Sequence, residues 1–314
     1  MSKDDYAFLS DEQTAEDGKP VKAPFGYYGA KQRIAKQIVD MLPPHNAWVE
    51  AFCGSAALTL AKPQSPIEVI NDLNDEIVNL FKQLRQNQRK LSRAVALTPY
   101  AHAEFEKAYE RGDKPDPLER ARRFLVATMM TINGTIGFNQ SGFSFSQSYT
   151  RNNREARVNR WCNLPDRLEL VVERLRSIRI EKRDARRLLE MFVDRPATLV
   201  YLDPPYFTKR GSTYVIDANE RQFHIELLDI CARAKCMLLI SSYESDLYSE
   251  MLKEVDGWVR TTVETHTRDT TGQDYPRTEV LWTNASFEKA RATGAVPIIL
   301  TAKEEAQRKV NPAR

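Results

Sequence analysis

The strongest constraint on how this chain can fold is the segment Val200–Tyr206, where an apolar run ends abruptly at Asp-Pro-Pro-Tyr. Such a continuous apolar run is typical of a strand buried on both faces of a parallel sheet. Asp203 then follows the carboxyl end of that strand, where open α/β sheets bind ligands. Pro204 and Pro205 cannot extend the strand, because proline lacks the N–H that a sheet ladder needs. We therefore expect an α/β fold with Asp203 at its ligand-binding edge.

The same segment indicates what that edge could bind. The Asp203 carboxylate and the Pro204 carbonyl remain as two neighbouring acceptors, and the Tyr206 ring lies next to them in the sequence. Two acceptors and an aromatic ring suit a planar base that carries an amino group. A tight turn after a buried strand would use similar residues, so the segment alone does not separate a structural from a functional reading.

A second informative region begins at Trp48, with the sequence Trp-Val-Glu-Ala-Phe-Cys-Gly-Ser-Ala-Ala-Leu. It predicts a strand, a tight turn at Gly54 and a helix, an arrangement in which a ligand can approach bare backbone. About twenty residues after Glu50, a second short strand ends at Asp72, a spacing at which an acid binds ribose hydroxyls in nucleotide-binding sheets. The unit therefore favours a ligand that contains adenosine. A single glycine is present, whereas the dinucleotide fingerprint has three.

A third segment, Pro24–Lys31, contains two glycines, two tyrosines and a lysine before a helical pattern over residues 32–42. The free N–H groups of a helix amino terminus could hold a carboxylate or a phosphate there. An ordinary entry into a helix would also explain it.

In this order, the three segments resemble the Dam-like DNA adenine methyltransferases, which methylate the exocyclic amino group of adenine with S-adenosylmethionine. The family's motifs are an aromatic-x-Gly-x-Lys, an acid-x-Phe-x-Gly loop, an Asn-Asp pair, a target-recognition region and Asp-Pro-Pro-Tyr. The matching residues are Tyr27, Gly29 and Lys31; Glu50, Phe52, Gly54 and Ser55; Asn71 and Asp72; and Asp203, Pro204, Pro205 and Tyr206. The resemblance covers residues 24–284.

The resemblance implies S-adenosylmethionine as cofactor and direct displacement onto an adenine flipped out of duplex DNA. It makes Asp203, Pro204, Pro205 and Tyr206 catalytic. The residues it assigns to the cofactor are Tyr27, Gly29, Lys31, Glu50, Phe52, Cys53, Gly54, Ser55, Asp72 and Asp203. Within that set, Asp72 would bind the ribose, the loop 52–55 would contact the methionine portion, and Lys31 would lie near both cofactor and DNA.

The region between Asp72 and Asp203 is expected to read DNA. Residues 133–149 are rich in amides, hydroxyls, glycines and aromatic rings, which predicts a polar β-hairpin. Arginines then recur every third residue from position 151 to 160, which on a helix gives one basic face for phosphates. The predicted DNA-contacting residues are Lys31, Asn139, Gln140, Ser141, Gln147, Arg151, Arg154 and Arg157. The resemblance does not extend to a GATC target, because Phe143–Ser148 lacks the usual Phe-Asn-Val-Pro-Phe-Gly pattern.

These positions predict a Rossmann-like methyltransferase sheet with an inserted, mainly helical recognition domain that carries a β-hairpin. The expected divisions are an acidic flexible tail (1–23), a discontinuous catalytic domain (24–81 and 177–284), the recognition domain (82–176) and a C-terminal extension (285–314). Two alternatives stay open at this stage. One is a protein glutamine-amide methyltransferase, and the other is an inactive DNA-binding protein of the same fold.

Composition agrees with this interpretation without identifying it. The chain has 314 residues, 42% of them hydrophobic, and a net charge of +3 that is too small to indicate a nucleic-acid binder by itself. No apolar run reaches the length of a membrane span, so we expect a cytoplasmic protein, encoded by a bacterium or phage, whose partner is double-stranded DNA. Four cysteines and four histidines show no metal-ligand spacing, so no metal is expected. A homodimer would suit a palindromic target, although no interface stripe stands out.

Overall fold

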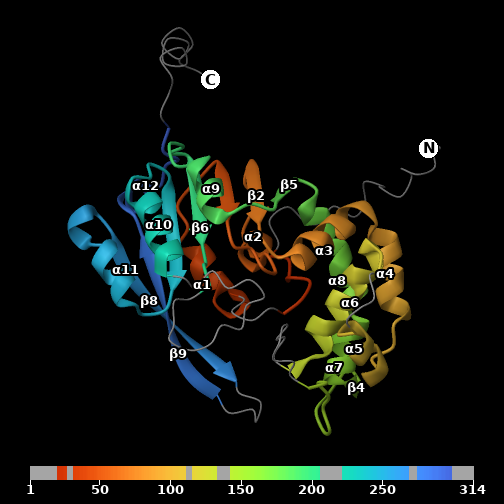
Figure 1. The fold of residues 1–314 in the computed structure, drawn as a ribbon. Coiled ribbons are helices and arrows are strands. Elements are labelled where there is room, and N and C mark those ends of the chain that lie inside the picture. Colours follow the sequence, from red (N-terminus) through yellow and green to blue (C-terminus); the bar gives the residue numbers. More distant parts are fainter. Residues whose placement is uncertain are drawn as a thin grey trace, which may run out of the picture.

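The fold is built around a seven-stranded sheet with the strand order β5-β2-β1-β6-β7-β9-β8 (Figure 1). The computed structural model describes residues 20–26, 31–110, 115–132, 142–205, 221–268 and 274–298. The strands of the sheet are β1 (Ala47–Glu50), β2 (Ile67–Asn71), β5 (Ile178–Glu181), β6 (Thr198–Leu202), β7 (Met237–Ser242), β8 (Val259–Arg268) and β9 (Asp274–Thr283). The predicted strand before Asp203 is confirmed as β6, which is buried at every position.

The topology of the sheet creates one preferred binding edge. Strands β5, β2, β1, β6 and β7 run parallel, whereas β9 runs antiparallel to both β7 and β8. β1 lies between β2 and β6, so the strand order reverses direction there, and ligands bind at such a switch point. Glu50 pairs in register with Tyr201, so the carboxyl ends of β1 and β6 lie side by side.

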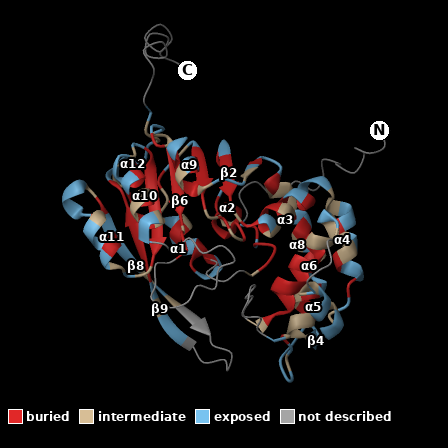
Figure 2. Ribbon diagram, in the orientation of Figure 1, coloured by how far each residue is buried: buried red, intermediate tan, exposed pale blue. Residues whose placement is uncertain are grey.

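Helices cover both faces of the sheet, and the two faces can be told apart by their hydrophobic clusters. One face packs against α1 (Ala35–Asp40), α2 (Ala57–Ala61) and α12 (Ala285–Thr293). The other packs against α9 (Ala185–Glu190), α10 (Arg221–Ala232) and α11 (Asp246–Met251). Figure 2 shows the strands between these layers as the most buried part of the molecule. This double coverage explains why the strands read as continuous apolar runs. Among the described residues, this half of the molecule also contains the short 3₁₀ helices η2 (Lys31–Arg33) and η4 (Glu254–Asp256).

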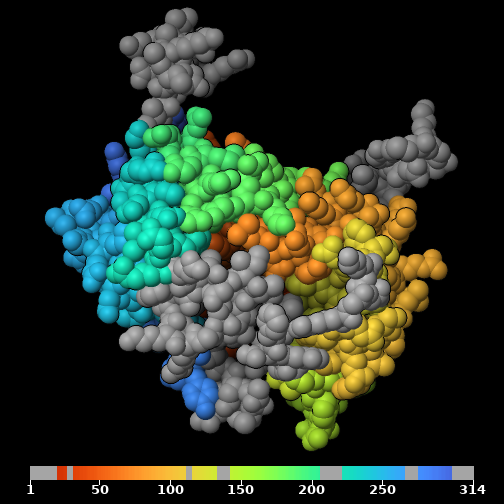
Figure 3. Space-filling view, viewed as in Figure 1, coloured from red at the N-terminus to blue at the C-terminus, as the bar shows by residue number. Residues whose placement is uncertain are grey.

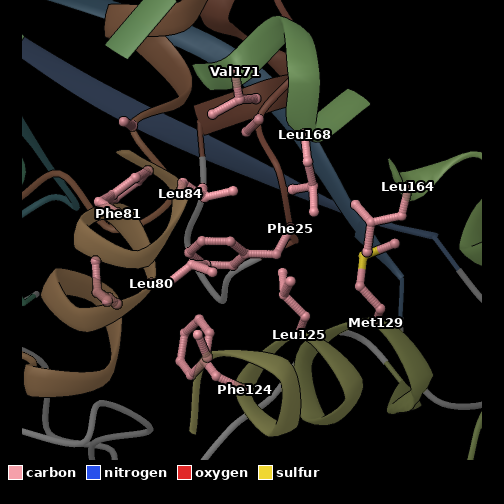
Figure 4. Packing of buried hydrophobic residues seen from close by; sticks show 14 of the residues in the cluster. Phe25, Leu80, Phe81, Leu84, Phe124, Leu125, Met129, Leu164, Leu168 and Val171 are labelled. Atoms are coloured by element: carbon pink, nitrogen blue, oxygen red, sulfur yellow. The ribbon is translucent and has the colours of Figure 1, made fainter. Parts of the chain in front are cut away.

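A helical unit lies beside the β5 edge of the sheet (Figure 1). Its helices are α3 (Asp75–Gln86), α4 (Gln88–Leu97), α5 (His102–Ala108), α6 (Pro117–Met130), α7 (Ala156–Cys162) and α8 (Leu164–Leu175). Phe25, from the segment before η2, is fully buried among side chains of α3, α6 and α8 (Figure 4). Its ring meets that of Phe124 edge to face at 5.1 Å, a favourable arrangement. The N-terminal segment is thereby anchored in the helical unit.

A buried ionic cluster also joins the helical unit to the sheet. Glu68 on β2 accepts hydrogen bonds from Lys62 Nζ at 2.8 Å and from Arg174 on α8, whose Nη2 lies 2.7 Å from Oε1. Arg174 also donates to the Thr59 carbonyl on α2 at 3.0 Å. The Glu68 side chain is completely buried, so these charges depend on one another.

One expectation about local structure needs correction, and two predicted boundaries can be placed on the observed helices. The predicted domain boundary at residue 82 lies inside α3, because the apolar face of that helix continues into the shared core. The helical pattern predicted over residues 32–42 is divided between η2 and the shorter α1. The C-terminal extension begins as α12, which Asn284 caps through a 3.0 Å bond to the Phe287 N–H.

Two properties of the described ranges bear on ligand and membrane binding. Within them, no helix is long and apolar enough to cross a bilayer. The same residues contain no group of three or more His, Cys, Asp or Glu side chains arranged to hold a metal ion.

Candidate active site

Three strands each bring an acid to the carboxyl edge of the sheet, on the face covered by α1, α2 and α12. Side chains two residues apart on a strand point to the same face. Trp48, Tyr201 and Leu281 all belong to the hydrophobic cluster on that face, and each lies two residues from an acid. Those acids are Glu50 on β1, Asp203 after β6 and Glu279 on β9.

Lys31 places one positive charge at this acidic edge. Its Nζ donates to Asp203 Oδ1 at 2.9 Å and to Oδ2 at 2.8 Å, and it lies 3.3 Å from Glu279 Oε1. Only 5% of the Lys31 side chain is exposed, against 15% for Asp203 and 5% for Glu279, so these charges are largely shielded from solvent. Burial alone lowers the pKa of Lys31, but the two carboxylates outweigh it and raise that pKa above its usual value. Lys31 is therefore a permanent ammonium.

This geometry changes what we infer for Lys31. The sequence predicted that it would lie near both cofactor and DNA, whereas the structure places its ammonium on the Asp203 carboxylate. The side chain is buried, so the geometry favours a role at Asp203 over a direct contact with DNA. Phe25 and η2 fix this position, because Gln32 Nε2 donates to the Phe25 carbonyl at 2.9 Å.

The proline pair after Asp203 is supported from α10. Pro204 and Pro205 are both buried, and Tyr206 lies outside the described residues. His224 Nδ1 lies 2.9 Å from the Tyr248 hydroxyl on α11. Burial lowers the pKa of His224 to about 4, against the opposing effect of a hydrogen bond with the Pro205 backbone. The imidazole is therefore neutral at physiological pH, and it connects the Pro205 backbone to the Tyr248 hydroxyl on α11.

The loop between β1 and α2 has an unusual backbone. Gly54 has φ 48°, and Ala56 has φ 54° and ψ 37°, both in the left-handed region that glycine tolerates best. Asp72 holds this loop, since Oδ2 accepts the Gly54 N–H at 2.8 Å while Oδ1 accepts the Asn74 N–H at 2.9 Å. Burial raises the pKa of Asp72 above its usual value. Asn71, one residue earlier, clamps the strand ends through the carbonyls of Ala51 and Arg183.

Glu50 is held by α2. Its Oε2 accepts bonds from the Thr59 N–H, at 3.0 Å, and from the Thr59 hydroxyl, which in turn accepts the Trp48 indole N–H at 2.7 Å. Burial raises the pKa of Glu50 to about 7, against the lowering effect of its bonds to Thr59. A carboxyl with this pKa changes its charge under physiological conditions.

Two polar atoms beside the loop lack protein partners. Ser55 Oγ is buried without a hydrogen bond, and no donor meets Glu50 Oε1, as far as the described residues extend. Buried polar groups are normally satisfied, so the Ser55 hydroxyl suits a polar ligand, and Glu50 Oε1 offers a second acceptor beside it. S-adenosylmethionine carries a cationic amino group and ribose hydroxyls, so the residues present fit it. Cys53 has its N–H on the Asn71 carbonyl and a thiol whose pKa is raised by burial, and Phe52 packs edge to face against Phe223.

The predicted DNA-contacting residues do not form one helical face. Arg151 lies on β3 (Thr150–Arg151) and Arg154 on β4 (Arg154–Glu155), whereas Arg157 lies on α7. Asn152 and Asn153 adopt left-handed conformations that turn the chain into a hairpin, so the periodicity of three was not helical. Gln147 is exposed just before this hairpin. Outside the described residues lie Tyr27, Gly29, Asn139, Gln140 and Ser141.

Comparison with known proteins agrees with this geometry. A family model of the D12 class N6 adenine-specific DNA methyltransferases matches residues 27–268. The chain belongs to this family. The enzyme therefore methylates adenine in DNA and uses S-adenosylmethionine as methyl donor, which decides against the two alternatives left open by the sequence.

The proteins that are similar to this chain include two methylases and one solved methyltransferase structure. The Type II methyltransferase M1.LlaDCHI of Lactococcus lactis subsp. cremoris is 26% identical over 247 residues, covering 72% of this chain and 82% of that protein. The modification methylase StsI of Streptococcus sanguinis is 24% identical over 219 residues, covering 65% of this chain and 31% of that protein. A solved precorrin-6y C5,15-methyltransferase from Geobacter metallireducens GS-15 shares 12% identity over 85% of this chain and 98% of its own, with a TM-score of 0.38.

Proposed function

We propose that this methyltransferase transfers the methyl group by direct displacement to an adenine flipped out of the duplex. Asp203 and the Pro204 carbonyl would accept the two hydrogens of the adenine amino group. The proposal rests on the position of Asp203, which follows β6 at the switch point, faces the same side as Glu50 and retains partial exposure. Accepting both amino hydrogens would reduce delocalisation of the nitrogen lone pair into the ring and aim it at the methyl group. Positioning and electrostatics of this kind are the main contributions a protein makes to such reactions.

When bound, S-adenosylmethionine supplies an electrophilic methyl group on a sulfonium. We propose that Asp72, Ser55 and Glu50 hold it. Asp72 would contact the ribose hydroxyls, and Ser55 would contact the carboxylate of the methionine portion. Glu50 would face the amino group of that portion. Tyr206 is proposed to stack on the adenine, as the residue directly after the proline pair.

Lys31 prepares Asp203 for this role. An adjacent ammonium favours the charged form of a carboxylate, and two bonds from Nζ fix the orientation of Asp203. A carboxylate offers about four lone-pair positions, but both Asp203 oxygens accept from Lys31, so binding the adenine amino group requires at least one of these two bonds to weaken. As the nitrogen gains its methyl group it becomes acidic, and Asp203 stands beside the proton that must leave.

DNA contact is proposed for the β3–β4 hairpin and the start of α7. Arg151 and Arg154 are exposed, Arg157 is half-buried, and none of the three has an ion-pair partner within the described residues. The β3–β4 hairpin and the long β8–β9 hairpin project toward the same side of the molecule, where the carboxyl ends of the parallel strands lie (Figure 1). The space-filling view shows the parts of both hairpins drawn in colour as separate projections on that side (Figure 3). We propose that residues 82–176 read the target while residues 24–81 and 177–284 perform the chemistry.

We propose that the enzyme acts in the cytoplasm on chromosomal or phage DNA. A homodimer would present one active site to each strand of a palindromic target, and size-exclusion chromatography with light scattering tests it.

The decisive experiment replaces the proposed acceptor. Asp203→Ala should reduce methyl transfer from labelled S-adenosylmethionine to duplex DNA by several orders of magnitude, while cofactor binding and cooperative thermal unfolding persist. The matched control is Asp194→Ala, an exposed acid paired with Lys235, which should stay near wild-type activity. An Asp203→Ala enzyme that still methylates adenine at a rate close to wild type would refute the role of Asp203 as an acceptor for the amino group.

A further inference from the structure

Glu279 stands out as a buried charge for which the proposed mechanism has no use. It lies on β9, is 4% exposed, and sends Oε1 to within 3.3 Å of Lys31 Nζ. The Ser241 hydroxyl on β7 donates to that same Oε1 at 2.5 Å. Its position is thus fixed from two sides, by a strand neighbour and by the ammonium.

Asp203 and Glu279 both approach the Lys31 ammonium. Lys31 is a single ammonium between two carboxylates, and it lies closer to Asp203 than to Glu279. Burial is the main cause that raises the pKa of Glu50 and of Tyr201, and the charge of Asp203 raises both further. Stranding a buried charge without a partner is costly, so the placement of this cation has consequences for every acid around it.

We propose that Glu279, oriented by Ser241, is a positioning residue that holds the Lys31 ammonium when Asp203 engages the adenine amino group. The inference rests on the proposed function of Asp203. Before the base arrives, both Asp203 oxygens accept from Lys31, so the amino group must compete with a cation for them. Glu279 offers that cation a second carboxylate within reach of the flexible lysine stem. It thereby lowers the free-energy cost when Asp203 exchanges its hydrogen bonds with Lys31 for bonds with the adenine amino group.

Glu279→Gln tests this role, because glutamine keeps the side-chain shape and an acceptor for Ser241 but removes the charge. Single-turnover methylation at saturating DNA and cofactor should slow by about tenfold, the range typical of losing one charge-assisted contact. The dissociation constants for S-adenosylmethionine and for DNA should change by less than about twofold. The matched control is Glu264→Gln on the adjacent strand β8, which is exposed and should leave the rate unchanged.

A double-mutant cycle separates positioning from a general structural effect. If Glu279 acts through Lys31, adding Glu279→Gln to Lys31→Met should slow the reaction no further than Lys31→Met alone. Fully multiplicative effects, or a Glu279→Gln single-turnover rate within about twofold of wild type, would overturn the proposal. Should Glu279→Gln fail to fold, Ser241→Ala retains every charge and should slow single turnover in the same direction. An unchanged Ser241→Ala rate would then overturn it. An Asp203→Ala enzyme that methylates adenine at a rate close to wild type would instead overturn the proposed function of Asp203.

Discussion

The pKa of Glu50 makes cofactor affinity depend on pH in a way that can be calculated. Its carboxyl is buried and titrates at about 7, and we propose that its ionised form faces the cationic amino group of S-adenosylmethionine. The pKa is raised in the folded protein, so the ionised fraction grows as pH rises through 7 and is lost as pH falls. From pH 7.0 to 5.5 that fraction falls from about one half to about 3%, which weakens binding up to about 15-fold.

Isothermal titration calorimetry of S-adenosylmethionine across pH 5.5 to 7.0 measures this dependence. An α-amino group titrates near 7.7–8.0, so the ligand amino group stays mostly protonated over this range. Glu50→Gln is the matched control, because glutamine still accepts from Thr59 but cannot titrate. The ratio of wild-type to variant affinity should follow the ionisation of Glu50. Parallel pH profiles for the two proteins would refute an ionic role for Glu50.

Three further results are expected. Glu68→Gln should destabilise the fold by about 3–5 kcal/mol, since it leaves Lys62 buried without a carboxylate, whereas Glu190→Gln in an exposed pair should cost less than about 1 kcal/mol, as measured by denaturant unfolding. Phe25→Ala should cost about 3–5 kcal/mol in the same measurement, because the ring is fully buried, and a loss below about 1 kcal/mol would contradict the anchoring role. Arg154→Ala should weaken DNA binding uniformly across sequences and reduce the salt slope by about one, so an unchanged slope would argue against phosphate contact.

The local pattern of the sequence was enough to predict the parallel strand before Asp203, the turn at Gly54 and the acid at the end of β2. Each depends on neighbouring residues alone: an apolar run, a glycine, and an acid at a fixed spacing. The structure places all of them at one edge, as predicted. The roles assigned to the individual site residues stay predictions.

What the sequence did not predict depends on contacts between distant segments. The Lys31–Asp203 pair joins residues 172 positions apart, and no local period encodes it. Glu279 had a usable signal, because it alternates in phase with buried Leu281 on a closing strand, and an acid at such a position needs a partner. The arginine periodicity was misleading for a different reason. Two asparagines with φ above zero can turn a chain wherever they occur, and the spacing of their neighbours then loses its helical meaning.

The completely buried carboxylate of Glu68 has a consequence for exchanging target preference between enzymes. Arg174 connects α8 to Glu68 on β2 and to the Thr59 carbonyl on α2. A recognition unit transplanted from a relative must therefore contain an equivalent of Arg174 to pack against the sheet in the same way. A chimaera cut at residue 82 would also sever α3 in mid-helix. Crossover points placed before Asp75 and after Leu175 would instead transfer whole helices together with Arg174.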